Sequence, residues 1–307
     1  MEFISSHVKI VLNIMNVLNK YIFGILCLSS LGLYSCDKDE NSNPDSTTFA
    51  TGTVELPALR NGANDVFISH STLYKGQSVV TYSMEYDKSK KHARWIAFKY
   101  YNQTAQTTWN RNDWKQTEWG GDPWQSDPKV PASAQRVQAD FGARGYQRGH
   151  ICASSDRLYS QDANEQTFYY TNMSPQKGYF NTGIWGDLEG KVRTWGRSDS
   201  FRDTLYVVKG AALDKENQIW EYIGNDRTKP VPKYYYMALL CKKGETFKAI
   251  GFWMDQSTTV KPVLSECAKT IDELEILTGL DFFHNLSDNL ENAVESKYAL
   301  SAWPTLQ

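Results

Sequence analysis

Residues 146–189 bring together side chains that could hydrolyse a phosphate ester. Histidine is the side chain whose unperturbed pKa, about 6.5, suits a general base near neutral pH. Carboxamide and carboxylate oxygens bind hard divalent cations or the waters around them, and arginine presents a positive fork to phosphate. Few structural roles need all of these in one short segment. The residues concerned are Arg148, His150, Asn172, Asn181 and Glu189.

Hydrolysis of a phosphodiester makes three demands on such residues. The attacking water must lose a proton, the charged transition state must be neutralised, and the leaving oxygen must be stabilised. His150 is the predicted base. Mg²⁺ could meet the other two demands, with a carbonyl oxygen from Asn181 or Asn172 as its ligand. Glu189 would hold metal-bound waters, and Arg148 would face a phosphate or a neighbouring carboxylate.

The spacing of Asn181 and Glu189 predicts a helix that carries both. They are eight positions apart, which is slightly more than two helical turns, so both would lie on one face of a helix over residues 180–190. Trp185 would point away from that face and pack into the core.

Each of these residues also has an ordinary structural explanation when it is taken alone. A histidine after glycine is more often a turn residue than a base. Asn172 could form a turn, Asn181 could cap a helix, and Glu189 could be a solvated helix end. The joint occurrence of the residues, in this order and spacing, favours a site.

Several motifs of the chain resemble the DNA/RNA non-specific endonuclease family, whose active site is a ββα-metal finger. The similarity extends over residues 67–303 and includes Val207–Gly210 and Glu273–Phe283. Agreement of several motifs in order and spacing is far more specific than a lone Arg-Gly-His. The central motifs are Arg148-Gly149-His150, Ser155-Asp156-Arg157, Asn172-Met173-Ser174-Pro175-Gln176 and Asn181-x-x-x-Trp185-x-x-Leu188-Glu189.

The resemblance implies a role for each candidate. His150 would be the general base, Asn181 the direct ligand of Mg²⁺ (with Mn²⁺ as a substitute), and Glu189 a partner of the metal through water. Asn172 would be an active-site amide near the histidine or the phosphate. Arg148 matches the arginine of the motif, and an upstream arginine that faces the transition-state phosphate falls on Arg111. The implied activity is hydrolysis of DNA and RNA with little sequence preference, because such a site reads phosphate rather than base edges.

One position departs from the family's pattern. The aspartate that usually precedes Arg-Gly-His is Gln147 here, a change that removes a negative charge but keeps a hydrogen-bonding group. The departure leaves open a second hypothesis, a non-catalytic surface module that binds nucleic acid or glycan through the tryptophan-rich residues 109–124. A third is a metal phosphoesterase for small substrates.

The amino-terminal segment predicts export. Lys20 precedes an apolar run, residues 21–34, that is too short and too often interrupted by glycine and serine for a membrane span. The run ends in Leu33-Tyr34-Ser35-Cys36, which resembles a bacterial lipobox. We expect residues 1–36 to be a lipoprotein signal peptide with an acylated Cys36, and residues 37–52 to be a flexible tether. The expected product is an outer-membrane lipoprotein, periplasmic or on the cell surface.

Residues 53–307 are expected to form a single endonuclease domain of the α+β class, with a central antiparallel or mixed sheet flanked by helices. Thr270, with Glu273 three residues on and Gly279 as a stop, predicts a capped helix. A Lys242–Glu245 turn predicts a hairpin. Strands are expected over residues 66–70, 78–86, 95–101, 204–210, 233–241 and 247–254.

The net charge of −2 provides no global attraction to nucleic acid, so phosphate binding would need a metal and a local basic patch. Basic residues beside the predicted metal helix could form that rim or an ordinary solvated face: Lys177, Lys191, Arg193, Arg197 and Arg202.

Three cysteines fall within the expected domain. Cys241 and Cys267 are the favoured pair for an exported protein, and Cys152 is expected to be a small buried residue. His70 and His92 are expected to be ordinary surface or strand-end histidines.

Overall fold

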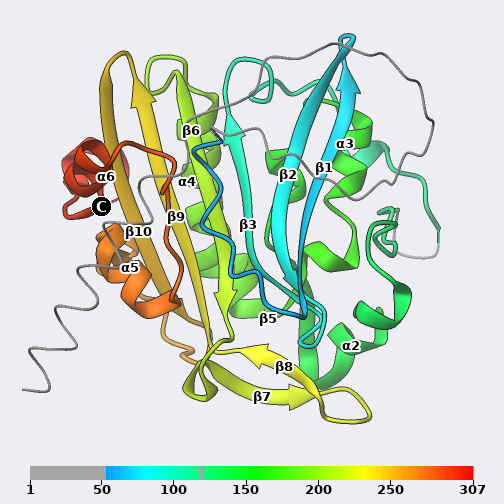
Figure 1. Cartoon of the computed structure of the whole chain (residues 1–307). Helices are drawn as coiled ribbons and strands as arrows, with labels where there is room; N and C mark the ends of the chain where they lie inside the picture. The colour runs from blue at the N-terminus through cyan, green and yellow to red at the C-terminus, as the bar shows by residue number, and fades with distance from the viewer. Residues whose placement is uncertain (1–52, 118–120, 307) are drawn as a thin grey trace, which may run out of the picture. The chain divides into compact units, whose positions relative to one another are not determined.

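An antiparallel sheet of seven strands forms the centre of the fold (Figure 1). The computed structural model describes residues 53–117 and 121–306, so the predicted signal peptide, Cys36 and the tether lie outside the described residues. The strands, in spatial order, are β1 (Asp65–Tyr74), β2 (Gln77–Asp87), β3 (His92–Tyr100), β6 (Thr204–Ala212), β9 (Tyr234–Lys243), β10 (Thr246–Asp255) and β11 (Ala268–Lys269).

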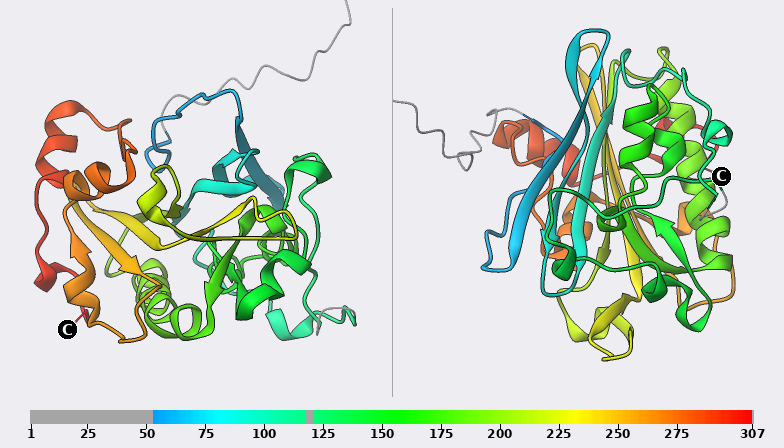
Figure 2. Two further views of the ribbon diagram at one scale, coloured as in Figure 1. Left: turned by 90° about the horizontal axis from the view of Figure 1, so that it is seen from below. Right: turned by 90° about the vertical axis from the view of Figure 1, so that its right-hand side faces the viewer.

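Helices cover both faces of this sheet (Figure 2). Helix α4 (Gly186–Arg197) lies on one face, and α5 (Ile271–Thr278) and α6 (Asp288–Glu295) lie on the other. Successive residues of a strand point to opposite faces. Val207 accordingly packs into the core on the α4 side, and Val208 packs into the core beneath α5 and α6. The predicted α+β class is confirmed, with every paired strand antiparallel.

Most of the expected elements form for the reasons seen in the sequence. The Thr270 hydroxyl accepts a hydrogen bond from Glu273 N, the Glu273 carboxylate accepts one from Thr270 N, and Gly279 ends α5 with a φ of +70°. The predicted end of a strand at Gly210 is wrong, because β6 continues to Ala212. Glycine is needed there because a Cβ would overlap the hydroxyl of Tyr236.

A smaller unit packs on the α4 side of the sheet. It consists of the two-stranded pair β4 (Tyr146–His150) and β5 (Met173–Lys177), followed by α4, with α3 (Gln161–Gln166) in the connection. Another hairpin, β7 (Ile219–Ile223) with β8 (Lys229–Pro232), lies beside β4, where the Tyr146 hydroxyl donates to Glu221 Oε1 at 2.6 Å.

Two buried histidines connect the layers. His92 lies at the end of a strand, as expected, because it begins β3, and His70 lies inside β1. The expectation that both are ordinary histidines is wrong, because both are buried and bonded. His92 is 1% exposed and lies 2.7 Å from the Ser174 hydroxyl of β5. His70 is 2% exposed and lies 2.9 Å from Asp127 Oδ2. Their partners are 82 and 57 positions away in the chain, which is why local patterns do not reveal them.

The tryptophan-rich segment is irregular but packed. It belongs to a longer irregular segment, residues 102–145, whose described part contains short helical turns and α2 (Ala139–Gly142). Trp124 is 8% exposed and meets the ring of Phe168 edge-on at 4.9 Å between centroids. Trp119 lies outside the described residues. Among those described, no helix is long and apolar enough to cross a bilayer.

The favoured disulfide does not form, because Cys241 and Cys267 are both buried free thiols. Cys241 is in β9, whereas Cys267 directly precedes β11, two strands away. Ala268 of β11 pairs with Phe252 of β10, and Phe252 pairs with Met237 of β9. Ala268 and Met237 therefore lie at the same position along the sheet, and Met237 is four residues from Cys241. At about 3.3 Å per residue this separation far exceeds the reach of a disulfide. Cys152 is buried as expected.

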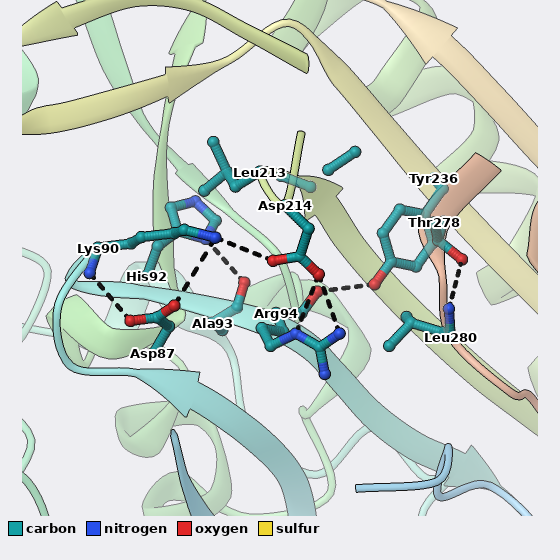
Figure 3. A pocket seen from close by; sticks show the side chains of 12 residues that line it. Asp87, Lys90, His92, Ala93, Arg94, Leu213, Asp214, Tyr236, Thr278 and Leu280 are labelled. Atoms are coloured by element: carbon teal, nitrogen blue, oxygen red, sulfur yellow. Dashed lines mark hydrogen bonds and ion pairs between the residues drawn. The ribbon is translucent and has the colours of Figure 1, made fainter. Parts of the chain in front are cut away.

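Figure 3 shows a small cavity where β2, β3 and the end of β6 meet. Its charged groups are paired with one another. Asp214 accepts from Lys90 Nζ and from Arg94 Nη2, each at 2.9 Å, and Arg94 also bonds Glu85. This network joins three segments of the sheet, and its partners satisfy each other rather than a ligand.

Candidate active site

Strand β4 carries Arg148 and His150 to the edge of a groove. The two residues alternate with Gly149, so their side chains leave the same side of the strand. On the opposite side, a Cβ at Gly149 would overlap the carboxamide of Gln176 in β5. The glycine of the Arg-Gly-His motif is therefore required by close packing between the paired strands.

His150 sits between two aromatic rings, with Trp124 at 5.1 Å and Phe168 at 5.2 Å between centroids. Its Nε2 is shielded from solvent and has no hydrogen-bond partner among the described residues, so Nδ1 is the ring nitrogen left to face the groove. Burial, together with the positive charges of Arg111 and Arg148, lowers the pKa of His150 well below its usual range. The imidazole is therefore neutral at neutral pH and can accept a proton.

Asn181 lies in an irregular turn before α4. Residues 180–185 form a π-helical turn that is broken at Gly183, with φ −95° and ψ −118°, and the α-helix begins only at Gly186. The predicted continuous helix over residues 180–190 is wrong for this reason. Trp185 is fully buried, as expected, and stacks on Phe180.

The carboxamide of Asn181 is held by Gln147. Asn181 Nδ2 donates to Gln147 Oε1 at 2.8 Å, which commits the amide nitrogen and leaves Oδ1 for a ligand. Gln147 is thus a neutral acceptor at the position where the family's pattern has aspartate, and it orients the residue predicted to bind the metal.

Glu189 belongs to a charge cluster that sequence reasoning did not identify. Lys209 of β6 is fully buried and donates to Glu189 Oε1 at 3.0 Å and to Asp156 Oδ2 at 2.9 Å. Arg193 adds a weaker contact to Asp156 at 3.4 Å. Burial raises the pKa of Glu189, whereas Lys209 and Arg193 outweigh burial and lower the pKa of Asp156.

Two guanidinium groups border the groove. Arg148 lies over the ring of Trp124 at 4.2 Å from the centroid. Arg111 donates to both oxygens of Asp122, at 2.9 and 2.6 Å, and to the hydroxyl of Ser154 at 3.2 Å. Arg111 therefore reaches the site from the irregular segment, more than thirty residues upstream of β4.

Five of the six candidates line one pocket of about 230 Å³. It shares Arg111, Trp124, Arg148 and Asn181 with a wider groove of about 590 Å³, within the usual size range of ligand sites. The candidates in the smaller pocket are Arg111, Arg148, His150, Asn181 and Glu189.

Asn172 does not line this pocket. Of the two positions expected for its amide, near the histidine or near the phosphate, the structure places it beside the backbone that follows His150. It is fully buried. Its Oδ1 accepts from Cys152 N at 2.8 Å, and its Nδ2 donates to Cys152 O at 2.9 Å and to Thr167 O at 2.6 Å. Because Cys152 follows His150 by two residues, this clamp fixes the backbone that leads out of β4.

Sequence reasoning assigned no site role to Lys209, Asp122 or Trp124, and it named Asp156 only as part of the motif Ser155-Asp156-Arg157. A lysine inside the apolar run of β6 was the available signal, because a buried ammonium group requires carboxylate partners. The expected basic rim is only partly present. Arg193 lines the pocket, whereas Arg202 is 1% exposed and donates to Gly196 O.

The donor set fits a hydrated divalent cation. Asn181 offers one neutral oxygen, and the Glu189 carboxylate is already engaged by Lys209, so it suits contact through water better than direct ligation. Mg²⁺ commonly accepts one or two protein oxygens and keeps several waters. These are the residues that would hold the ion.

A ββα unit with a histidine and an asparagine in one groove, packed against an antiparallel sheet, defines a ββα-metal nuclease. The model of the family described as DNA/RNA non-specific endonuclease matches residues 62–289. The chain belongs to this family of metal-dependent nucleases, which hydrolyse nucleic acids.

Named relatives agree with this assignment. Nuclease C1 of Cunninghamella echinulata var. echinulata is 30% identical over 52% of this chain and 65% of its own length. A nuclease of Nostoc sp. is 30% identical over 70% of this chain and 76% of its own length. Human mitochondrial nuclease EXOG is 25% identical over 67% of this chain and 56% of its own length. The chain thus spans less than two thirds of two of these three relatives.

A solved structure shares the fold. A chain from the crystal structure of the EndoG/EndoGI complex superposes with a TM-score of 0.57 and 20% identity, over 72% of this chain and 88% of that chain.

Proposed function

We propose that this chain is a Mg²⁺-dependent endonuclease that hydrolyses phosphodiester bonds of DNA and RNA with little sequence preference. The observation that carries the proposal is the convergence of His150 and Asn181, with Arg111 and Arg148, on one pocket. This reaction requires a general base, an oxygen ligand for a cation and positive groups that bind the phosphate. The pocket offers an imidazole, an amide oxygen and two guanidinium groups for these tasks.

Each residue of the pocket has its own role in the proposed hydrolysis. His150 accepts a proton from the attacking water through Nδ1, because burial and the nearby arginines keep its imidazole neutral. Arg148 and Arg111 bind the phosphate, and Arg111 is positioned by Asp122. A divalent cation held by Asn181 would neutralise charge on the phosphate and stabilise the leaving oxygen. The products would carry 5′-phosphate and 3′-hydroxyl ends.

Plasmid DNA and single-stranded RNA, incubated with the protein in Mg²⁺ and in a chelator, test this proposal. We expect cleavage of both in Mg²⁺, none in the chelator, and a loss of about 10²–10⁴-fold in His150→Ala. His284→Ala is the matched control, because His284 is exposed on the far face. Binding without cleavage would favour the non-catalytic module, and turnover of a small diester alone would favour a phosphoesterase.

We also propose that the protein is an exported lipoprotein anchored through Cys36. Support comes from the lipobox-like Leu33–Cys36 and the polar residues 37–52 that follow. Labelling of cells with a radioactive fatty acid tests this, because wild-type protein should take up label and float with outer membranes, whereas Cys36→Ala should do neither. Retention of label by Cys36→Ala would overturn it.

A further inference from the structure

Three carboxylates converge on the face of the sheet opposite to the groove. Asp272 and Glu275 lie one turn apart on α5, and Glu295 is the last residue of α6. Each offers an oxygen, and the three oxygens lie within 4.8 Å of one another. Helices α5 and α6 pack side by side over β10 (Figure 1), so the cluster bridges two elements that are separate in sequence.

Burial distinguishes Glu295 from an ordinary surface acid. Its side chain is only 5% exposed, and its Oε1 is shielded from solvent with no hydrogen-bond partner in the part of the chain that the structure describes. A buried carboxylate oxygen without a partner is costly. Glu275 uses one oxygen to accept from Phe282 N at 2.8 Å, which leaves its second oxygen available. The arrangement therefore has unmet capacity to bind a cation.

Neighbouring charges increase that capacity. Asp281, in the connection between the helices, and Glu291, on α6, add negative charge close to both Glu275 and Glu295.

The pocket on the other face provides a contrast, because Glu189 and Asp156 there are paired with Lys209. Among the described residues, no ion pair joins a lysine or arginine to Asp272, Glu275 or Glu295. A pair of helices that presents three converging carboxylates without a counter-ion is suited to an external cation.

We propose that Asp272, Glu275 and Glu295 form a Ca²⁺ site that joins α5 to α6. Ca²⁺ accepts six to eight oxygens in flexible geometry, so three carboxylates and several waters would satisfy it. Mg²⁺ requires near-ideal octahedral geometry, which favours Ca²⁺ for side chains drawn from two helices. The ion stabilises the carboxy-terminal helices, because a ligand that binds only the folded state raises its stability. The site is independent of the nuclease groove and of the activity proposed for it.

Calcium titration of the purified full-length protein, stripped of metal by a chelator, tests this proposal. We expect calorimetry with CaCl₂ to show one site per chain beyond any at the groove, and the melting temperature to rise with Ca²⁺. Glu295→Gln, which keeps the side-chain volume, should abolish the rise. Asn181→Ala, which changes the groove, and Asp288→Asn, an exposed acid at the start of α6, should retain it.

Glu275→Gln provides a second variant in case Glu295→Gln does not fold. The proposal is overturned if Ca²⁺ leaves the melting temperature unchanged, or if both glutamine variants keep the full calcium-dependent rise. An equal rise with Mg²⁺ at the same concentration, lost in the same variants, would overturn the assignment to calcium.

Discussion

Asn181 donates from its amide nitrogen to Gln147 Oε1 at 2.8 Å. Gln147 is the position at which the chain departs from its family's pattern, and it contacts the residue proposed to bind the metal. A glutamine that presents its oxygen reproduces the hydrogen bond that a carboxylate could make, without the charge. The departure is therefore compatible with an oriented metal ligand.

Removing this acceptor should weaken metal binding. Gln147→Ala frees the carboxamide of Asn181 to rotate, and loss of such supporting contacts typically costs about 10- to 100-fold in metal affinity. The measurement is the Mg²⁺ concentration that gives half-maximal plasmid cleavage. Gln147→Glu keeps the acceptor and adds a charge near the cation, so its midpoint should be at or below that of wild type. An unchanged midpoint in Gln147→Ala would show that Asn181 needs no such support.

The buried lysine should be essential for stability. Lys209→Met leaves Asp156 and Glu189 without their main counter-ion, and breaking a buried pair in this way costs about 3–5 kcal/mol. Urea unfolding measures the loss. Lys243→Met is the matched control, because its ion pair with Asp203 is exposed and should contribute little to the free energy of unfolding. Similar losses in the two variants would contradict the role of Lys209.

Asn172 should affect turnover rather than metal affinity. Asn172→Ala leaves the buried N–H and C=O of Cys152 without partners, at about 1–3 kcal/mol each. We expect lower stability and lower kcat with an unchanged Mg²⁺ midpoint, because the clamp positions His150 and does not touch the cation. A shifted midpoint would count against this assignment. Asn292→Ala, which changes an exposed residue of α6, should change neither the stability nor kcat.

Gly149 and Gln176 should be energetically coupled. Gly149→Ala places a methyl group against the Gln176 carboxamide, and overpacking of this kind costs about 1–3 kcal/mol or more. Gln176→Ala removes the obstacle, so the double variant should be more stable than the sum of the single effects by about 0.5–3 kcal/mol. If the losses of unfolding free energy in the two single variants simply add in the double variant, the cost of Gly149→Ala does not come from contact with Gln176.

His92 should contribute to acid sensitivity. Burial lowers the pKa of His92 to about 3 from an ordinary value of 6.5. Between these values the unfolded chain binds a proton that the folded protein does not. The stability associated with neutral His92 is therefore complete above about pH 6.5 and declines as the pH falls toward 3, by up to about 1.4 kcal/mol per pH unit.

A glutamine at this position does not titrate. In His92→Gln, the unfolding free energy should fall less steeply over that pH window than in wild type. His284→Gln, which changes an exposed histidine, should follow wild type. Parallel curves for wild type and His92→Gln would mean that His92 titrates normally in the folded protein.

Local chemistry explains which features could be predicted from the sequence. The cap and stop of α5 depend on contacts within ten residues, and the hairpin between β9 and β10 depends on its turn. The order and spacing of the motifs identified His150 and Asn181 as candidates, and the family resemblance added Arg111. The structure brings all three to one pocket.

The errors arise where distant contacts override local pattern. The break at Gly183 lets Asn181 turn toward Gln147, thirty-four positions away, so α4 begins later than helical spacing predicts. The partner of His70 comes from the irregular segment. Separation of Cys241 from Cys267 depends on the order of β9, β10 and β11, which spacing along the chain does not encode.

Strand β6 carries Lys209 toward the carboxylates on one side and the neighbouring Val208 toward the apolar layer on the other. A slip of β6 by a single residue would drive the ammonium group into hydrocarbon and withdraw it from Asp156 and Glu189. The ion pairs therefore stabilise the observed register of β6 relative to a shifted one. The alignment of β6 in the central sheet and the placement of Lys209 beside the pocket residue Glu189 are thus one structural requirement.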